Sequence, residues 1–282
     1  MYTTLVSAAE LADLPDDHCL VDCRFSLMDT TLGAQQYAEG HARGAVYAHL
    51  DDDLSGEIVL GKSGRHPLPS REAFVRTLRA WGINSRTQVV AYDDSGGPFA
   101  ARLWWMLRWI GHESAAVLDG GYAAYLAAGG PVSSEPASPR SGRVTEVRDT
   151  LAEVVTAQDV MNNSGWTLLD AREGARYRGD AEPLDPVAGH IPGALNLPCQ
   201  QNLTADGRFK PAGDLRDLYN SVLGNKDVGS VVCYCGSGVT AAHNALAMTH
   251  AGLGTPKLYA GSWSEWITDV DRPVSRESQL EE

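Results

Sequence analysis

Short hydrophobic runs alternate along this chain with stretches whose apolar residues recur at helical spacing. Runs of this kind are typical of strands buried inside a sheet. We expect strands at residues 20–22, 87–92 and 115–118, and again at 167–169, 230–234 and 257–259. The alternation of strands with helices predicts an α/β fold with a mainly parallel sheet.

Polar residues mark where several of the predicted helices begin. Ser7 is followed three residues later by Glu10, and Thr156 by Asp159, which is the spacing of a capping box. Ser70 precedes a third amphipathic stretch. The first two pairs occupy equivalent places in the two halves of the chain.

The chain repeats itself at an offset of about 145 residues. Four pairs of segments match in the same order: "CLVDCRF" (19–25) with "TLLDARE" (167–173), "GHARGAVYAHL" (40–50) with "GHIPGALNLPC" (189–199), "QVVAYDDSGGPFAAR" (88–102) with "SVVCYCGSGVTAAH" (230–243), and "AVLDGGYAAYL" (116–126) with "PKLYAGSWSEWI" (256–267). This order predicts two duplicated domains.

A segment rich in glycine, proline and serine, "GGPVSSEPASPRSGRV" (129–144), separates the copies. Such a composition is typical of a linker. We place the boundary near residue 140, with one domain at 1–140 and the other at 141–282.

Composition narrows the class of protein. A chain of 282 residues with 43% hydrophobic residues can fill two ordinary cores. Its net charge of −13 disfavours nucleic acid and anionic membranes as partners, and its apolar runs are shorter than the roughly 20 residues of a membrane span.

The first residues have no basic start or long apolar stretch, so we expect a cytoplasmic protein. Five cysteines, an odd number, are expected to be free thiols.

Cys235 stands where a predicted strand gives way to a predicted helix, Val239–Met248. Gly236 and Gly238 allow the backbone between them to curl, so that amide N–H groups converge near the positive end of the helix. Such a loop stabilises an anion, and we expect it to favour the thiolate of Cys235. Cys233 lies within the apolar run and is interpreted as a structural core residue.

The first half provides an internal control for this loop. Asp93 stands at the position of Cys235 in the matched segment. A carboxylate cannot carry sulfur, so we expect the second domain to be catalytic and the first to support it.

These motifs together resemble the rhodanese superfamily, and within it the two-domain 3-mercaptopyruvate sulfurtransferases. The resemblance rests on the tandem arrangement, on "GHIPGA" (189–194) after an Asp-Ala-Arg strand end, and on the loop "CGSGVT" (235–240), and it extends to "GSWSEW" (261–266). It implies two domains that each have a central five-stranded parallel sheet, with the reactive cysteine in the second.

Three alternatives remain beside this assignment. Thiosulfate sulfurtransferases usually carry an Arg-Lys pair after the cysteine, where this chain has Gly236 and Ser237. Related phosphatases have a longer loop closed by an arginine, whereas position 241 is Ala241. A non-enzymatic persulfide-binding module is the third. The first of these remains the main competitor, because many such enzymes accept both donors.

The resemblance implies a two-step sulfur transfer by covalent catalysis. Cys235 takes the sulfur of 3-mercaptopyruvate, pyruvate is released, and a persulfide remains in the loop formed by Gly236, Gly238, Val239 and Thr240. A thiol, reduced thioredoxin or cyanide then removes the outer sulfur. No cofactor is implied, and no cysteine and histidine set has the spacing of a metal site.

An α-keto acid donor needs a cationic partner for its carboxylate. Arg172 and Arg176, four residues apart after a strand end, are the candidates that the resemblance supports, with Arg178 in reserve. The alternative is that these arginines pair with nearby acids such as Asp170 or Asp180.

The resemblance also implies a relay for protons beside the cysteine. Its serine would be Ser237, its histidine His66 and its aspartate Asp51, with Asp52 and Asp53 as alternatives for the last. Histidine suits this task because its ordinary pKa lies near neutrality. His41 and His190 recur in both copies of the "GHxxGA" segment and are interpreted as packing residues, since one copy should be catalytic.

Overall fold

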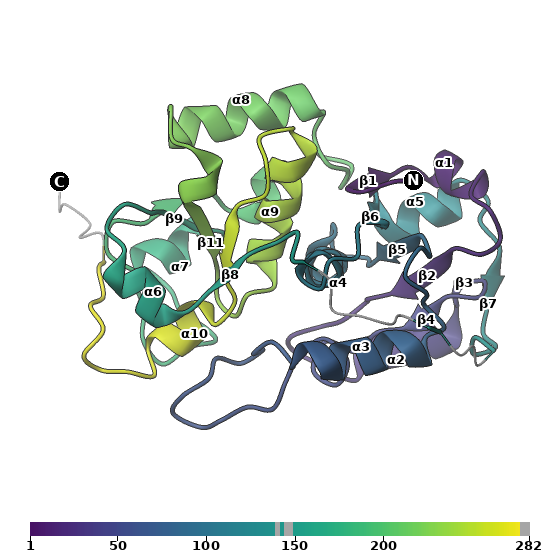
Figure 1. Cartoon of the computed structure of the whole chain (residues 1–282), viewed down its shortest axis with the longest axis horizontal. Coiled ribbons are helices and arrows are strands. Elements are labelled where there is room, and N and C mark those ends of the chain that lie inside the picture. The colour runs from purple at the N-terminus through teal and green to yellow at the C-terminus, as the bar shows by residue number, and fades with distance from the viewer. Residues whose placement is uncertain (139–141, 144–148, 277–282) are drawn as a thin grey trace. The chain divides into compact units, whose positions relative to one another are not determined.

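The computed structural model describes residues 1–138, 142–143 and 149–276 (Figure 1). Two compact units are present: the first comprises residues 1–56, 68–152 and 203–209, and the second comprises 57–67, 153–202 and 210–282. Each half of the chain therefore contributes one short segment, 57–67 or 203–209, to the other half's unit. The boundary predicted near residue 140 lies outside the described residues.

Each unit is built on a five-stranded sheet in which all neighbouring strands are parallel, as predicted. The first sheet has the order β1-β6-β5-β2-β4, with β1 Leu5–Val6, β2 Cys19–Asp22, β4 Val46–Tyr47, β5 Val89–Tyr92 and β6 Ala115–Leu118. The second has the order β10-β9-β11-β12-β8, with β8 Val154–Val155, β9 Thr167–Asp170, β10 Leu195–Asn196, β11 Val231–Tyr234 and β12 Lys257–Tyr259. Read from opposite ends, the two orders match strand for strand, which confirms the duplicated fold. The sequence patterns identified the three central strands of each sheet and missed the two-residue edge strands.

Helices follow most strands (Figure 1). In the first unit they are α1 Ala8–Ala12, α2 Leu32–Glu39, α3 Arg71–Ala80, α4 Pro98–Trp109 and α5 Gly121–Ala127. In the second they are α6 Ala157–Asn162, α7 Gly174–Arg178, α8 Ala212–Leu223, α9 Thr240–His250 and α10 Ser262–Trp266, with 3-10 turns at Cys199–Asn202 and Val228–Ser230. A short antiparallel pair, β3 His41–Ala42 with β7 Val132–Ser133, completes the first unit. No described helix has the length and apolar character needed to cross a membrane.

The predicted helix caps are confirmed. Ser7 with Glu10 and Thr156 with Asp159 form reciprocal capping boxes at α1 and α6. The Ser70 side chain accepts the N–H of Ala73 at the start of α3. These local signals depend on neighbouring residues and are therefore readable from sequence.

The two repeated histidines have the same surroundings in both units. His41 stacks on Tyr37 with ring centroids 3.8 Å apart, and His190 stacks on Tyr177 at 3.9 Å. In each case Nδ1 lies 2.7 Å from the carbonyl oxygen of that tyrosine. The interpretation of both as packing residues fits this arrangement.

Candidate active site

Cys235 follows β11 directly and lies in the turn that leads into α9. The backbone N–H of Gly238 points at its Sγ atom, with a nitrogen–sulfur distance of 3.1 Å. The Cys235 N–H donates to Oγ of Ser262 at 3.1 Å, and this Oγ lies 4.0 Å from the sulfur. The thiol is thus held at the centre of the loop beside hydrogen-bond donors.

Gly238 is required for the tight curl of this loop. Its φ is +81°, in the left-handed region that side chains rarely adopt. A Cβ atom at this position would lie 2.3 Å from the carbonyl oxygen of Ala260. The glycine therefore provides both the backbone conformation and the space for the neighbouring strand end.

The segment after β12 holds the loop of Cys235 in place through backbone hydrogen bonds. The N–H groups of Trp263 and Ser264 donate to the carbonyls of Cys235 and Gly236, at 3.0 and 2.9 Å. Ser262 is the described non-glycine residue with positive φ, 55°, and is fully buried. A strained backbone conformation of this kind persists only where surrounding contacts hold it. Here those contacts keep the segment after β12 packed against the loop of Cys235.

The matched loop of the first unit shows what such a turn binds. The carboxylate of Asp93 accepts four backbone N–H groups, from Ser95, Gly97, Phe99 and Ala100, at 2.8 to 3.0 Å. Burial raises the pKa of Asp93, while these N–H groups act in the opposite direction. The repeated loop therefore directs several backbone N–H donors at one acceptor group, which is the chain's own side chain in the first unit.

Two further cysteines lie near the reactive loop. Cys233 is inside β11 and wholly buried, and burial raises its pKa. Burial, with a smaller contribution from Cys235, raises the pKa of Cys199 to about 12. Both are kept as neutral thiols, which fits a structural role.

The segment 57–67 brings the predicted serine and histidine together. Gly64 packs so closely on the segment after β12 that a Cβ atom there would lie 2.6 Å from the carbonyl oxygen of Gly261. The next residue, Arg65, donates its N–H to Oγ of Ser264 at 3.1 Å. His66 then places Nδ1 2.8 Å from Oγ of Ser237. This contact joins residues 171 positions apart in the chain.

Asp51, the third member of the predicted relay, belongs to the first unit. Burial raises its pKa, and its N–H donates to Nδ1 of His49 at 3.2 Å. Of the two alternatives, the carboxylate of Asp53 accepts the backbone N–H of His49 at 2.8 Å, and the carboxylate of Asp52 lies 3.5 Å from Nδ1 of His49. The aspartate of the relay stays a prediction.

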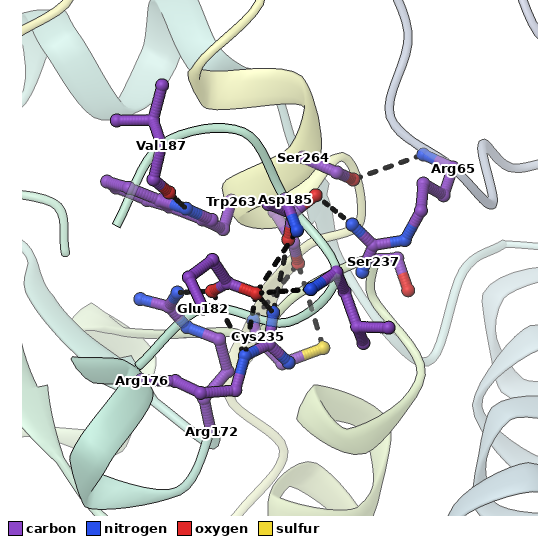
Figure 2. A network of polar contacts seen from close by, with 12 residues as sticks. Arg65, Arg172, Arg176, Glu182, Asp185, Val187, Cys235, Ser237, Trp263 and Ser264 are labelled. Atoms are coloured by element: carbon purple, nitrogen blue, oxygen red, sulfur yellow. Dashed lines mark hydrogen bonds and ion pairs between the residues drawn. The ribbon is translucent and has the colours of Figure 1, made fainter. Parts of the chain in front are cut away.

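Two guanidinium groups lie beside the reactive loop (Figure 2). A Cβ atom on Gly236 would lie 3.0 Å from Nη2 of Arg65 and 3.4 Å from Nη1 of Arg176. Burial lowers the pKa of Arg65, as does the like charge of Arg176, while Cys235 raises it. Both guanidinium groups are paired with carboxylates. Arg176 binds Glu182 at 2.6 Å and Asp185 at 3.1 Å, and Arg65 also binds Asp185.

Arg172 has a different environment from Arg176. It binds Asp170 at 2.6 Å and the carbonyl of Gly189 at 2.7 Å, and its guanidinium lies 4.8 Å from the ring of Trp263. The first unit repeats this arrangement with Arg24, Asp22, Gly40 and Tyr122, at 2.6, 2.7 and 4.3 Å. This repetition favours a role for Arg172 in holding the strand end.

Arg176 has no such twin. It precedes the tyrosine that stacks on the repeated histidine, and the residue at that place in the first unit is Gln36. Two of the differences between the units are therefore cysteine against aspartate in the matched loops and arginine against glutamine before the stacked tyrosine. Arg178, the reserve candidate, pairs with Asp180 at 2.8 Å near the surface.

The sequence reasoning missed Arg65, Glu182, Asp185 and Ser262. Arg65 is adjacent to the predicted His66, so one signal for it was present. Glu182 and Asp185 lie in the stretch 178–188, which is nine residues longer than its counterpart 38–39 in the first copy. Their partners are up to 120 residues away in the chain, and no local pattern predicts such contacts.

Comparisons with known proteins agree with this geometry. The model of the rhodanese-like domain matches residues 7–128 and 153–269. The chain is 46% identical over 278 residues to a Pseudomonas aeruginosa protein named "Probable 3-mercaptopyruvate sulfurtransferase", covering 98% of this chain and 97% of that one. It is 32% identical to a mouse thiosulfate sulfurtransferase, covering 99% and 96%. The structure of a 3-mercaptopyruvate sulfurtransferase from Leishmania major superimposes with a TM-score of 0.84 at 34% identity, covering 96% of this chain and 75% of that one.

Proposed function

The chain belongs to the rhodanese-like family and is a sulfurtransferase, and from this premise we propose that Cys235 accepts sulfur from 3-mercaptopyruvate. Because these relatives are named as sulfurtransferases, the chain is an enzyme, and the alternative of a non-enzymatic binding module is wrong. The donor, the acceptor and the roles of the site residues are the parts that we propose.

The observation that carries the proposal is the pair of matched loops. Four N–H groups hold the Asp93 carboxylate in the first unit, and Cys235 takes its place in the second with the N–H of Gly238 directed at Sγ. A loop that binds an anion stabilises both the attacking thiolate and the persulfide that it becomes. Gly236, Val239 and Thr240 complete this loop.

The reaction follows from this arrangement. The Cys235 thiolate attacks the sulfur of 3-mercaptopyruvate, an S–S bond forms, and the C–S bond breaks with its electron pair remaining on carbon. Pyruvate leaves as its enolate and takes up a proton, and Cys235 is left as a persulfide. Ser237 and His66, at hydrogen-bond distance, are the groups that we assign to this proton, with Asp51 as the third member of the relay.

The donor's carboxylate would bind to Arg176 and Arg65, the two cations nearest Gly236. Arg172, also predicted to bind substrate, would act indirectly, because its Nη1 lies 3.4 Å from Glu182, the carboxylate that orients Arg176.

Thiosulfate is the second candidate donor, and one observation favours it. Although Gly236 and Ser237 replace the usual cations of the loop, Arg65 and Arg176 bring two positive charges to the same place. A doubly charged donor could be held by these two groups.

We further propose that a thiol, such as that of reduced thioredoxin, or cyanide removes the outer sulfur. A cytoplasmic location is proposed because all five cysteines are free thiols in the structure, a state that persists in reducing compartments.

Two measurements test the function. Intact-protein mass spectrometry after treatment with 3-mercaptopyruvate, without acceptor, should show the gain of one sulfur atom. Cys235→Ser should show none, and Cys23→Ala, a buried cysteine of the first unit, should behave as the unmodified protein. Steady-state kinetics with each donor decides between them: a higher kcat/KM for thiosulfate would reverse the proposed order.

A further inference from the structure

We propose that the carboxylate of Asp185 occupies the anion-binding position of the resting enzyme, and that the donor's anionic group must displace it. This inference rests on the proposed function, in which Arg65 and Arg176 bind the donor beside Cys235. It makes Asp185 a specificity-determining residue.

The contacts of Asp185 are those that a bound anion would make. Its Oδ2 lies 3.1 Å from Nη2 of Arg176, and its Oδ1 is bound by Nη1 of Arg65. The same two guanidinium groups flank Gly236 in the loop that follows Cys235. The Asp185 side chain is only 3% exposed, so it fills this position rather than lying in solvent.

The neighbouring Glu182 is anchored in a different way. Its carboxylate accepts the N–H groups of Leu184 and Asp185, at 3.1 and 3.2 Å, and also binds Nε and Nη2 of Arg176. In the part of the chain that the structure describes, the hydrogen bonds of the Asp185 carboxylate come from the two arginines instead. Exchange of Asp185 for another anion therefore leaves the turn at 182–185 intact, whereas loss of Glu182 would not.

Space for the displaced side chain lies next to it. A hollow of about 300 Å³ is lined by residues that include Ile58, Arg65, Leu184, Asp185 and Pro186. Rotation of Asp185 into this hollow would expose the carboxylate to water while leaving its backbone in place.

Charge balance then discriminates between donors. Arg65, Arg172 and Arg176 face Asp170, Glu182 and Asp185, three charges against three, to which the proposed Cys235 thiolate adds a fourth negative charge. A monoanionic carboxylate that replaces Asp185 preserves this balance. A dianion such as thiosulfate adds one negative charge to a largely buried cluster, which is unfavourable. Asp185 should therefore weaken the binding of both donors, and of thiosulfate more.

Asp185→Asn tests the proposal in the full-length enzyme. We expect KM for 3-mercaptopyruvate to fall roughly three- to tenfold, and KM for thiosulfate to fall further, because two cations lose their competing carboxylate. Inhibition by pyruvate should strengthen in parallel. An unchanged or increased KM would overturn the proposal and make Asp185 a residue that positions the arginines.

Two control variants separate this effect from others. Asp180→Asn removes the same charge from the same segment, where the carboxylate pairs with Arg178 near the surface, and should leave both KM values unchanged. Glu182→Gln should raise KM, since it releases Arg176. A similar fall in KM with either control variant would contradict a specific exchange at Asp185.

A binding measurement makes the result independent of turnover. In the Cys235→Ser background, calorimetric titration with pyruvate and with sulfate should show tighter binding when Asp185→Asn is added. If Asp185→Asn is not recovered folded, Asp185→Ser serves for the same titration. Wild-type enzyme that forms no pyruvate from 3-mercaptopyruvate would refute the proposed donor, while the titration would still decide whether Asp185 competes with anions.

Discussion

Nδ1 of His66 lies 2.8 Å from Oγ of Ser237, inside the loop that holds the sulfur of Cys235. A hydroxyl and an imidazole in contact can pass a proton to or from a substrate at the sulfur. The two donors differ in their need for such a step, because pyruvate leaves as an enolate that must be protonated, whereas sulfite leaves thiosulfate as a stable anion.

We therefore predict that Ser237→Ala and His66→Gln reduce kcat with 3-mercaptopyruvate by about 100-fold and reduce turnover of thiosulfate much less. Parallel steady-state assays with both donors measure this. Equal losses with both donors would show that the pair maintains the loop rather than handles a proton.

The two arginines after β9 should respond differently to substitution. Arg172→Gln breaks a buried ion pair with Asp170 and should destabilise the protein by about 3–5 kcal/mol in chemical denaturation. Arg24→Gln, its twin in the first unit, should cost a similar amount. Arg176→Gln should instead raise KM for 3-mercaptopyruvate at least tenfold, with a smaller loss of stability. If Arg172→Gln and Arg176→Gln change KM alike at equal stability, the division of roles is wrong.

Gly238 should tolerate no side chain. Gly238→Ala combines a φ of +81° with a Cβ only 2.3 Å from a carbonyl oxygen, so we expect loss of activity and a marked fall in Tm. Gly193 is a matched control: its φ is +78°, but a Cβ there would meet nothing within 4 Å. Gly193→Ala should cost about 1 kcal/mol of stability, the cost of strain alone, and retain activity.

The three cysteines of the second unit, Cys199, Cys233 and Cys235, should differ in reactivity. All three thiols are buried, but that of Cys235 accepts the N–H of Gly238. At pH 7.5 we expect iodoacetamide to alkylate Cys235 and inactivate the enzyme, while Cys199 and Cys233, whose pKa burial raises, stay unmodified. Peptide mapping by mass spectrometry identifies the modified residue. Labelling of Cys199 ahead of Cys235 would contradict the assignment.

The raised pKa of Cys199 also predicts a pH dependence of stability. The unfolded thiol ionises near pH 9, whereas the folded thiol does so at about 12. The contribution of the neutral Cys199 thiol to the free energy of unfolding is therefore complete below pH 9 and is lost as pH rises towards 12. Cys199→Ala should reduce the decline in unfolding free energy over this interval, measured by urea denaturation at several pH values.

Sequence patterns predicted the parts of this fold that depend on near neighbours. Capping pairs such as Ser7 with Glu10, the central strands and the loop around Cys235 are all specified within a few residues. Edge strands such as Leu5–Val6 were missed because two residues give no periodicity. The distinction between Arg172 and Arg176 needed coordinates, since Glu182 contacts both arginines and Asp185 contacts Arg176 from a stretch that is longer than its counterpart in the first copy.

Segment 57–67 has a consequence for how this enzyme can be divided. It is encoded within the first copy yet packs in the second unit, where it supplies Arg65 and His66. A fragment that begins at residue 153 would carry Cys235 but leave these two groups on the other piece. The two copies are therefore not independent modules: the first half of the chain supplies the segment that carries Arg65 and His66 to the second unit.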